Sequence, residues 1–189
     1  MIGRTSGQDD PGTTRQLPDG VDVIDLTTFH DDRGALTEVF RSGGHEPEPA
    51  QWNLVRSEAN VLRGVHAHYH HADYLVVVHG TMRLGLVDLR EGSPSEGVRG
   101  VVELHSSRLQ AVAIPVGVGH GFYFPEPSVH IYGLSRPWSI DHHLGCRWDD
   151  PDLELDFGCD APILSQADDE AGSLGQLIAG VNSKLAPPG

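Results

Sequence analysis

Cysteine, long apolar runs and positive charge are all scarce in this sequence. Its only cysteines are Cys146 and Cys159, which excludes a disulfide framework and makes a reducing cytoplasm the expected compartment. No apolar run approaches the roughly 20 residues of a membrane-spanning helix, and the first residues lack the apolar segment of a signal peptide. The formal net charge of -14 repels phosphate backbones. We therefore expect neither a membrane nor a nucleic acid as a partner.

Turn-forming residues are abundant instead. The 23 glycines and 13 prolines separate short segments in which apolar and polar residues alternate, as is typical of all-β proteins. Strands are expected at residues 21–26, 35–40, 51–57, 61–68, 74–78, 82–89, 98–104, 111–114, 121–124 and 129–134. Strands at this spacing predict a barrel or a sandwich. We expect a flexible arm over residues 1–18, the barrel over residues 19–165 and a partly helical tail over residues 166–189.

Two motifs carry histidines that point to a site. His66 and His68 are two residues apart, so on a strand their side chains project from the same face. Asp73 precedes the next expected strand, and His120 ends the motif Pro-x-Gly-x-x-His. Together these motifs resemble the two motifs of the cupin superfamily, whose members are small antiparallel β-barrels with a site inside. The first cupin motif normally carries Glu where this chain has Asp73.

A longer series of segments resembles one cupin family in order and spacing. The segments are Phe29-His30-Asp31-Asp32-Arg33-Gly34, Gln51-Trp52-Asn53, Val61-Leu62-Arg63-Gly64-Val65-His66, Val87-Asp88-Leu89-Arg90-x-x-Ser93-Pro94, Ile114-Pro115-x-Gly117-x-x-His120-Gly121-Phe122, Tyr132 and Arg147-Trp148-Asp149-Asp150-Pro151. They are similar to the dTDP-4-dehydrorhamnose 3,5-epimerase (RmlC-like) family of deoxysugar biosynthesis. The resemblance covers roughly residues 21–165. It implies a double-stranded β-helix, or jelly-roll barrel, that forms a homodimer.

The resemblance also implies a mechanism. The family epimerises a 4-keto-6-deoxy sugar carried on dTDP: a base removes the proton α to the ketone, an enolate forms, and a tyrosine returns a proton on the other face. By position the base is His66, the proton donor is Tyr132, and the carboxylate that orients the base is Asp150. A histidine partnered by a carboxylate suits this proton transfer. The family needs no metal, because a lysine supports the enolate oxygen.

The same resemblance implies residues that hold the substrate. The positions that match the nucleotide and pyrophosphate contacts are Arg33, Glu38, Gln51, Asn53 and Arg63. Arginine pairs with diphosphate through two parallel hydrogen bonds, even in an acidic protein. His120 matches a histidine near the sugar, and Trp138 stands where the family has a second tyrosine. Tryptophan keeps a stacking surface at that position but cannot exchange a proton.

The chain departs from the family where the lysine would stand, because that position is Asp73. A carboxylate there would repel an enolate. His66, His68, Asp73 and His120 instead occupy the positions that bind metal in metal-dependent cupins, and three histidines with one carboxylate suit Fe(II), Mn(II), Ni(II), Zn(II) or Co(II). A divalent metal could then replace the lysine as the electrophile.

Plainer interpretations stand beside these. The chain has 12 histidines, so the metal group could be coincidence, and we expect His70, His71 and His79 at the surface or the rim of the site. Arg33 and Arg63 could form surface ion pairs. The leading function is a 3- or 3,5-epimerase acting on a nucleotide sugar. The alternatives are a metal-dependent cupin enzyme of secondary metabolism, such as an isomerase, cyclase or dioxygenase, and a ligand-binding cupin without catalysis.

Overall fold

A computed structural model of the chain describes residues 16–44 and 47–186. Residues 1–15 of the predicted arm therefore lie outside the described residues. Two five-stranded sheets and one two-stranded sheet make up the β-structure of the described part. None of the helices in the described ranges is both long enough and apolar enough to cross a bilayer.

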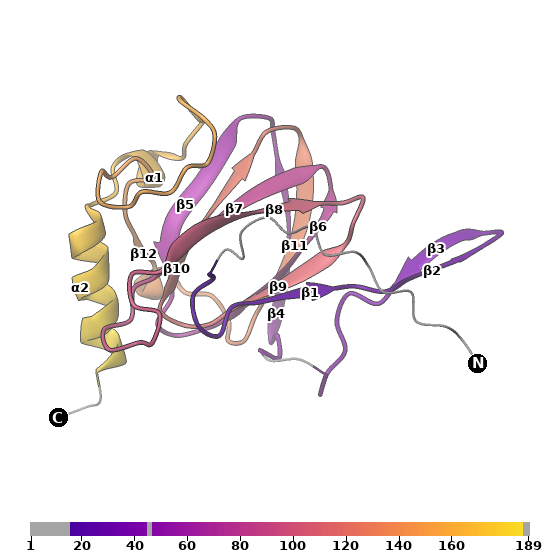
Figure 1. Ribbon diagram of the computed structural model, residues 1–189, viewed down its shortest axis with the longest axis horizontal. Coiled ribbons are helices and arrows are strands. Elements are labelled where there is room, and N and C mark those ends of the chain that lie inside the picture. Colours follow the sequence, from indigo (N-terminus) through magenta and orange to yellow (C-terminus); the bar gives the residue numbers. More distant parts are fainter. Residues whose placement is uncertain (1–15, 45–46, 187–189) are drawn as a thin grey trace.

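The two larger sheets face each other and are antiparallel throughout (Figure 1). Their strands are β1 (Asp22–Asp25), β4 (Gln51–Ser57), β5 (Val61–Ala67), β6 (Asp73–His79), β7 (Thr81–Asp88), β8 (Arg99–His105), β9 (Gln110–Ile114), β10 (Val118–Phe124), β11 (Ser128–Leu134) and β12 (Leu144–Gly145). The first sheet has the order β1-β9-β6-β11-β4, and the second has the order β12-β5-β10-β7-β8. From β4 to β7 and again from β8 to β12, sequential strands alternate between the sheets, and the predicted all-β jelly roll is confirmed.

The remaining strands, β2 (Thr28–Asp31) and β3 (Gly34–Thr37), form a hairpin that projects from the barrel (Figure 1). The sequence predicted a turn at residues 29–34 and a strand at residues 35–40, so the hairpin's first strand was missed. Its apolar side chains face solvent: Phe29 is 62% exposed and Leu36 is 66% exposed.

The main core lies between the two sheets. Leu75 and Val77 of the first sheet pack against Leu84 and Leu86 of the second. The outer face of β6 is also covered, because Tyr74 donates a hydrogen bond to the Val39 carbonyl at 2.9 Å. This double cover explains why β6 is an almost continuous apolar run rather than an alternating one.

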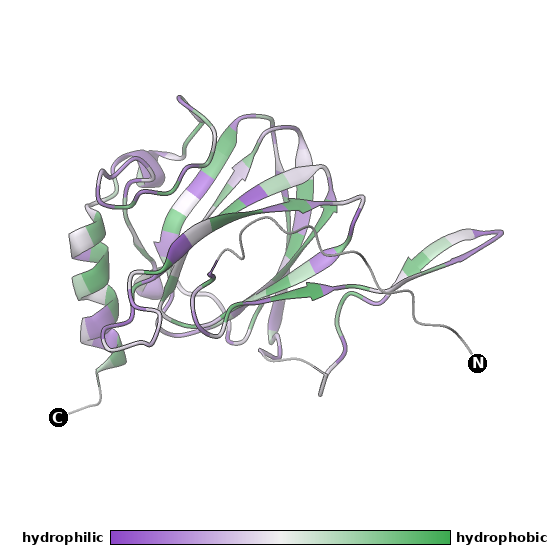
Figure 2. Ribbon diagram, viewed as in Figure 1, coloured by the Kyte–Doolittle hydropathy of each residue, from purple (hydrophilic) through white to green (hydrophobic). Residues whose placement is uncertain are grey.

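The C-terminal segment folds onto the outside of the second sheet. It contains α1 (Gln166–Asp169) and α2 (Leu174–Leu185), and a 3-10 turn, η1 (Ile140–His142), precedes β12. Ser173 and Gln176 cap the start of α2 reciprocally, and Leu177 and Val181 pack into the cluster that includes β5. Figure 2 shows hydrophobic and hydrophilic residues alternating along α2, as expected for a helix with one buried side. The predicted helical tail is confirmed.

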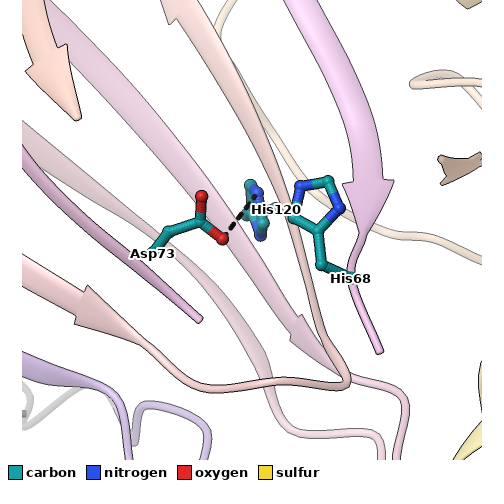
Figure 3. A group of neighbouring side chains, drawn as sticks. All are labelled: His68, Asp73 and His120. Atoms are coloured by element: carbon teal, nitrogen blue, oxygen red, sulfur yellow. Dashed lines mark ion pairs between the residues drawn. The ribbon is translucent and has the colours of Figure 1, made fainter. Parts of the chain in front are cut away.

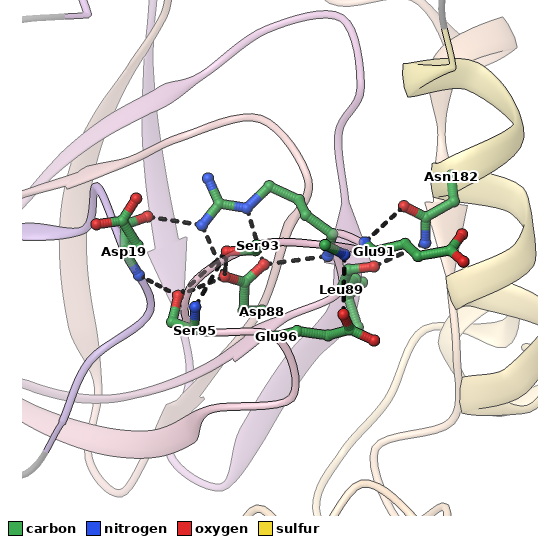
Figure 4. A network of polar contacts seen from close by, with 10 residues as sticks. Asp19, Asp88, Leu89, Glu91, Ser93, Ser95, Glu96 and Asn182 are labelled. Atoms are coloured by element: carbon green, nitrogen blue, oxygen red, sulfur yellow. Dashed lines mark hydrogen bonds and ion pairs between the residues drawn. The ribbon is translucent and has the colours of Figure 1, made fainter.

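A buried carboxylate organises the loop between β7 and β8. The Asp88 side chain is fully buried and accepts hydrogen bonds from Arg90 at 2.8 Å, Ser93 at 2.6 Å and Ser95 at 2.5 Å (Figure 4). Burial opposes ionisation, but these hydrogen bonds outweigh it and hold the pKa of Asp88 well below its usual range. Asp88 is therefore ionised and paired at neutral pH.

This loop fastens both ends of the described chain to the barrel. Arg90 donates to the Asp19 carbonyl at 2.7 Å, and the Asp19 amide donates to Ser95 at 2.6 Å. On the other side, Asn182 of α2 donates to the Leu89 carbonyl at 2.8 Å. One loop thus holds the N-terminal segment and the last helix in place.

Asp88→Asn should lower the free energy of unfolding by about 3 kcal/mol at pH 7, because it leaves Arg90 without its buried partner. Since the pKa of Asp88 is depressed in the folded state, its contribution is complete above about pH 5 and is lost as the pH falls below the unfolded value of about 3.9. Urea unfolding of both proteins between pH 3 and pH 7 measures the difference. Glu91→Gln, an exposed change in the same loop, is the control and should alter little.

Candidate active site

A cavity of about 350 Å³ opens between the two sheets, next to α1. The predicted site residues in its wall are Arg63, His66, His68, Asp73, His120, Tyr132 and Trp138. Its wall also includes His71, His130, His143 and Asp168, which were not predicted to lie there. The cavity therefore collects most of the residues that the two sequence motifs and the family resemblance brought forward.

Strand β5 carries one residue more than its partner β10 where it borders this cavity. His66 pairs with His120 and Arg63 pairs with Phe122, so three steps along β5 match two along β10. This bulge lets both Arg63 and His66 line the cavity, although residues three apart on a regular strand face opposite sides. Gly64 lies in the bulge with a φ of +111°, and a Cβ there would come within 2.9 Å of the His120 carbonyl oxygen. Only glycine fits this position.

His66 is held by a buried carboxylate. Its Nε2 lies 2.6 Å from Oδ1 of Asp168 on α1, and Ser165 donates its hydroxyl to the other carboxylate oxygen at 2.8 Å. Burial opposes ionisation of Asp168, but the hydrogen bond to His66 and those from Ser165 and Gly64 outweigh it and lower the pKa of the carboxyl. An ionised carboxylate can only accept, so Nε2 of His66 carries the proton. The other ring nitrogen, Nδ1, keeps its lone pair when the ring is neutral.

The carboxylate predicted to orient His66 was Asp150, and the structure places Asp150 elsewhere. Its Oδ2 accepts the Leu174 amide at 3.0 Å and its Oδ1 accepts the Asp152 amide at 3.0 Å, so it caps the start of α2 outside the cavity. The pattern Ser165-x-x-Asp168 is a helix-start signal that was available in the sequence. No local pattern could pair Asp168 with a histidine 102 residues away.

Tyr132 reaches the cavity from the opposite sheet. It lies on β11 between His130 and Leu134, and all three line the cavity because alternate residues of a strand share a face. Burial, followed by the nearby Asp73, raises the pKa of the Tyr132 hydroxyl, so this group keeps its proton at neutral pH. The cavity thus holds the His66 imidazole and the protonated Tyr132 hydroxyl on facing walls.

Trp138 stands at the mouth of the cavity with 49% of its surface exposed. Its backbone amide donates to Oε1 of Gln51 at 3.0 Å, and Gln51 donates to Asn53 at 3.0 Å. These two predicted substrate contacts therefore position Trp138, which offers a stacking surface at the entrance. Inside the mouth, the Arg63 guanidinium is anchored by Ser57 at 3.1 Å.

The structure does not bring Arg33 or Glu38 to the cavity of the same chain. Arg33 lies in the projecting hairpin, where its side chain is 89% exposed and pairs with Asp31. Glu38 follows the hairpin and pairs with Arg41. Both residues were predicted to contact the nucleotide together with Gln51, and the spacing along the chain gave no sign that the hairpin leaves the barrel.

His68, Asp73 and His120 meet inside the barrel, each offering one ligand atom within 4.8 Å of the others (Figure 3). Oδ2 of Asp73 lies 4.0 Å from Nε2 of His120. Burial raises the pKa of Asp73 to about 8 and lowers that of His120 to about 3. Both groups are then largely uncharged at neutral pH, so the 4.0 Å contact provides little charge attraction. His66 was predicted as a fourth ligand, but its Nε2 is bound to Asp168 instead.

Further histidines crowd the same region. His71 was expected at the surface or rim, yet it is 2% exposed and stacks on His68 with ring centroids 4.1 Å apart. His143 packs against His66 with centroids 4.4 Å apart. The sequence missed these contacts because both histidines lie outside regular strands, where alternation gives no direction.

Known proteins share the sequence pattern and the architecture of this chain. The family model described as dTDP-4-dehydrorhamnose 3,5-epimerase matches residues 16–176. The dTDP-4-dehydrorhamnose 3,5-epimerase of Pseudomonas aeruginosa is 32% identical over 166 residues, which cover 82% of this chain and 91% of the relative.

Solved structures of sugar epimerases have the same fold as this chain. The rmlC epimerase of Mycobacterium tuberculosis superposes with a TM-score of 0.80 and 30% identity, covering 89% of this chain and 90% of that one. ChmJ, a 3'-monoepimerase of Streptomyces bikiniensis in complex with dTDP-quinovose, superposes with a TM-score of 0.77 and 29% identity, covering 84% and 85% of the two chains.

Asp168→Asn should release the His66 ring from a single tautomer, because the neutral amide no longer requires a proton on Nε2. Nitrogen-15 NMR of the imidazole ring would show one tautomer in the unaltered chain and a mixture in the variant. The matched change Asp150→Asn, outside the cavity, should leave the His66 signals unchanged. The assignment of the pair is wrong if Asp150→Asn alters these signals and Asp168→Asn does not.

Proposed function

Because the chain belongs to the dTDP-4-dehydrorhamnose 3,5-epimerase family, we propose that it epimerises a dTDP-4-keto-6-deoxyhexose, at C3 or at C3 and C5, in deoxysugar biosynthesis. The observation that carries the proposal is the placement of His66, paired with Asp168, and Tyr132 on facing walls of one cavity. Epimerisation requires a base on one side of the reacting carbon and a proton donor on the other, and this cavity offers both.

The base is His66 in this proposal. A carbonyl acidifies the hydrogen on the adjacent carbon, and a histidine with a free lone pair can remove it. Asp168, ionised and 2.6 Å from Nε2, stabilises the imidazolium that results. The electron pair of the broken C–H bond moves onto the ketone oxygen as an enolate. Tyr132 then delivers its proton to the opposite face of the carbon, which inverts the centre.

The entrance suits the nucleotide part of such a substrate. The Arg63 guanidinium lines the cavity and offers parallel donors to a diphosphate. Trp138, held by Gln51, gives an exposed ring on which a base or a sugar can stack. His120 lies deeper, near the sugar in this proposal. A chain with a net charge of -14 needs such a local cation to bind an anionic ligand.

A second chain would complete this site. We propose a homodimer, because the hairpin of β2 and β3 projects from the barrel with Phe29 and Leu36 exposed. Arg33 and Glu38, whose positions match nucleotide contacts, lie on or beside this hairpin and away from their own cavity. Packing of the hairpin against the partner's barrel is the arrangement that would give these two residues a role in binding.

The proton transfers need no cofactor, since His66 and Tyr132 supply both groups. Within the described ranges, one group of side chains could hold a divalent cation such as Fe, Mn, Ni, Zn or Co, and it consists of His68, Asp73 and His120. The relatives reported above are all sugar epimerases, so a dioxygenase or cyclase is not favoured. We place the enzyme in the cytoplasm, on the scarcity of cysteine and the absence of a spanning helix in the described part.

With a dTDP-4-keto-6-deoxyglucose substrate in D₂O, the chain should incorporate deuterium at the carbon next to the ketone and form the epimer. His66→Asn should lower both rates by about 10²–10⁴-fold, the usual contribution of a positioned base. Tyr132→Phe should retain exchange but lose net inversion, because only the second proton transfer is removed. NMR of the sugar measures exchange and epimer together.

His79→Ala is the control for these variants, since His79 is exposed at the end of β6 and does not line the cavity. Its rates should equal those of the unaltered chain. The assignment fails if His66→Asn retains full exchange. It also fails for Tyr132 if Tyr132→Phe forms the epimer at the original rate.

dTDP should stabilise the chain against heat, by about 2.7 kcal/mol at a hundred times its Kd. Arg63→Ala should weaken dTDP binding by about tenfold to a hundredfold, because it removes hydrogen bonds to a charged group. Thermal-shift titrations measure both values. Arg108→Ala, which removes an exposed arginine paired with Asp25, is the control and should bind dTDP unchanged. An equal loss in both variants would show that only the overall charge matters.

A further inference from the structure

We propose that His68, Asp73 and His120 form a binding site for one divalent transition-metal cation inside the barrel. The three side chains come from different parts of the chain: His68 follows β5, Asp73 begins β6, and His120 lies on β10. Each offers one ligand atom within 4.8 Å of the others, and all three are at least nine-tenths buried. Imidazole nitrogens and a carboxylate are the ligand set that Zn(II), Mn(II), Fe(II), Co(II) and Ni(II) share.

The orientation of His120 fits a metal ligand. Its Nδ1 lies 3.1 Å from the Val118 carbonyl oxygen, which can only accept, so Nδ1 carries the ring proton. The lone pair of the neutral ring is therefore on Nε2, and this atom faces the Asp73 carboxylate at 4.0 Å. A backbone carbonyl that fixes the tautomer in this way is the usual support of a metal-binding histidine.

Asp73 lacks the partner that a buried carboxylate normally has. Within residues 16–44 and 47–186, its only ion-pair neighbour is His120, and no lysine or arginine forms an ion pair with it. Asp73 Oδ2 and His120 Nε2 thus face each other across a gap too wide for a hydrogen bond, and binding a cation there would release the proton that a neutral Asp73 carboxyl holds. A cation between them would satisfy both atoms at once.

The third proposed ligand, His68, also lacks a hydrogen-bond partner. Nδ1 of His68 is buried without a hydrogen-bond partner, and so are both ring nitrogens of His71, which stacks on it at 4.1 Å between ring centroids. Leaving a buried polar atom unpaired destabilises the folded state. Such a cluster is expensive in a barrel that serves no ligand, and a metal bound by His68 would recover part of that cost.

The geometry requires only a small adjustment. Bonds of about 2.1 Å at tetrahedral or octahedral angles bring ligand atoms to about 3.0–3.4 Å of one another, so the side chains must close in by roughly 1 Å. Three protein ligands leave coordination positions open toward the cavity, as in catalytic rather than structural sites. His66 remains outside the group and stays free to act as the base.

The site also suggests what the cation does, and this part rests on the proposed epimerase function. By the resemblance described above, the position of Asp73 belongs to a lysine that supports the enolate oxygen, and among the described residues no lysine lines the cavity. A divalent cation held by Asp73 would return positive charge to this point and accept the ketone oxygen at an open position. The cation would thus supply positive charge near the ketone oxygen, while His66 takes the proton and the C–H electron pair moves onto that oxygen, so no oxidant or reductant is needed.

Titration of the untagged, chelator-treated chain with Co(II) tests the site directly. We expect visible d–d absorption that saturates at one cobalt per chain, with a rise in melting temperature. His68→Ala and Asp73→Asn should each weaken cobalt binding at least tenfold. His130→Gln is the matched control, because His130 is a buried histidine of the same cavity outside the group, and it should bind cobalt as before. Circular dichroism shows whether each variant folds.

Two results would overturn the site. One is the absence of saturable binding of Co(II), Zn(II) or Mn(II) at one per chain. The other is binding that persists when His68→Ala and Asp73→Asn are combined, which would assign the metal to other histidines.

Deuterium exchange on the dTDP-4-keto sugar separates this proposal from the epimerase function. Exchange that stops with chelator and returns with metal supports both. Exchange that is indifferent to chelator, in a chain that binds no cobalt, refutes the metal site and leaves the epimerase standing. Cobalt binding without exchange refutes the epimerase and leaves the metal site. Asp73→Lys, which restores the family's cation, should abolish cobalt binding and make any remaining exchange insensitive to chelator.

Discussion

Between Arg63 and His66, β5 holds one residue more than β10, and the cavity depends on this difference. A regular strand would turn one of these side chains to the outside of the barrel. The bulge instead places the Arg63 guanidinium and the His66 imidazole in the cavity wall from a single strand, and it brings the backbone of β10 so close that Gly64 admits no side chain. Antiparallel pairing supplies the rigidity, because β5, β6, β10 and β11, which carry most of the strand residues in the cavity wall, are each bonded on both sides. The reacting groups therefore sit on sheets rather than on loops.

Much of the fold and of the candidate site could be predicted from the sequence. The features that could not be predicted were missed for physical reasons. Strand alternation and turn residues predicted most strands, because both are local properties. The motifs around His66 and His120 predicted all three residues that meet inside the barrel, His68, Asp73 and His120, since residues at strand ends keep their register. Asp150 was predicted as the partner of His66 because its position matches the carboxylate that orients the base in the family. The partner of His66 depends instead on how a distant helix docks.

The sequence also did not predict how the side chains of the loops are oriented. His71 and His143 lie in irregular segments, so nothing in the sequence indicated that both face the interior. The first strand of the hairpin, β2, was missed for a related reason: its residues are typical of a turn, and only tertiary structure shows that the hairpin extends into solvent. Site residues on strands were easier to predict than site residues in loops, because the side chains of a strand alternate regularly between two faces and those of a loop do not.

The docking of the C-terminal segment has a consequence for when the enzyme is active. The chain beyond the barrel pairs with β5 through the Leu62 amide and the Ile163 carbonyl at 3.0 Å, and it then delivers Asp168. During synthesis, the two sheets are complete well before residue 168 has left the ribosome. A nascent barrel therefore holds a histidine without its carboxylate, and so does a mature one whose last segment has locally detached. The His66–Asp168 pair thus depends on the docking of this last segment, and local fraying can remove it while the rest of the protein stays native.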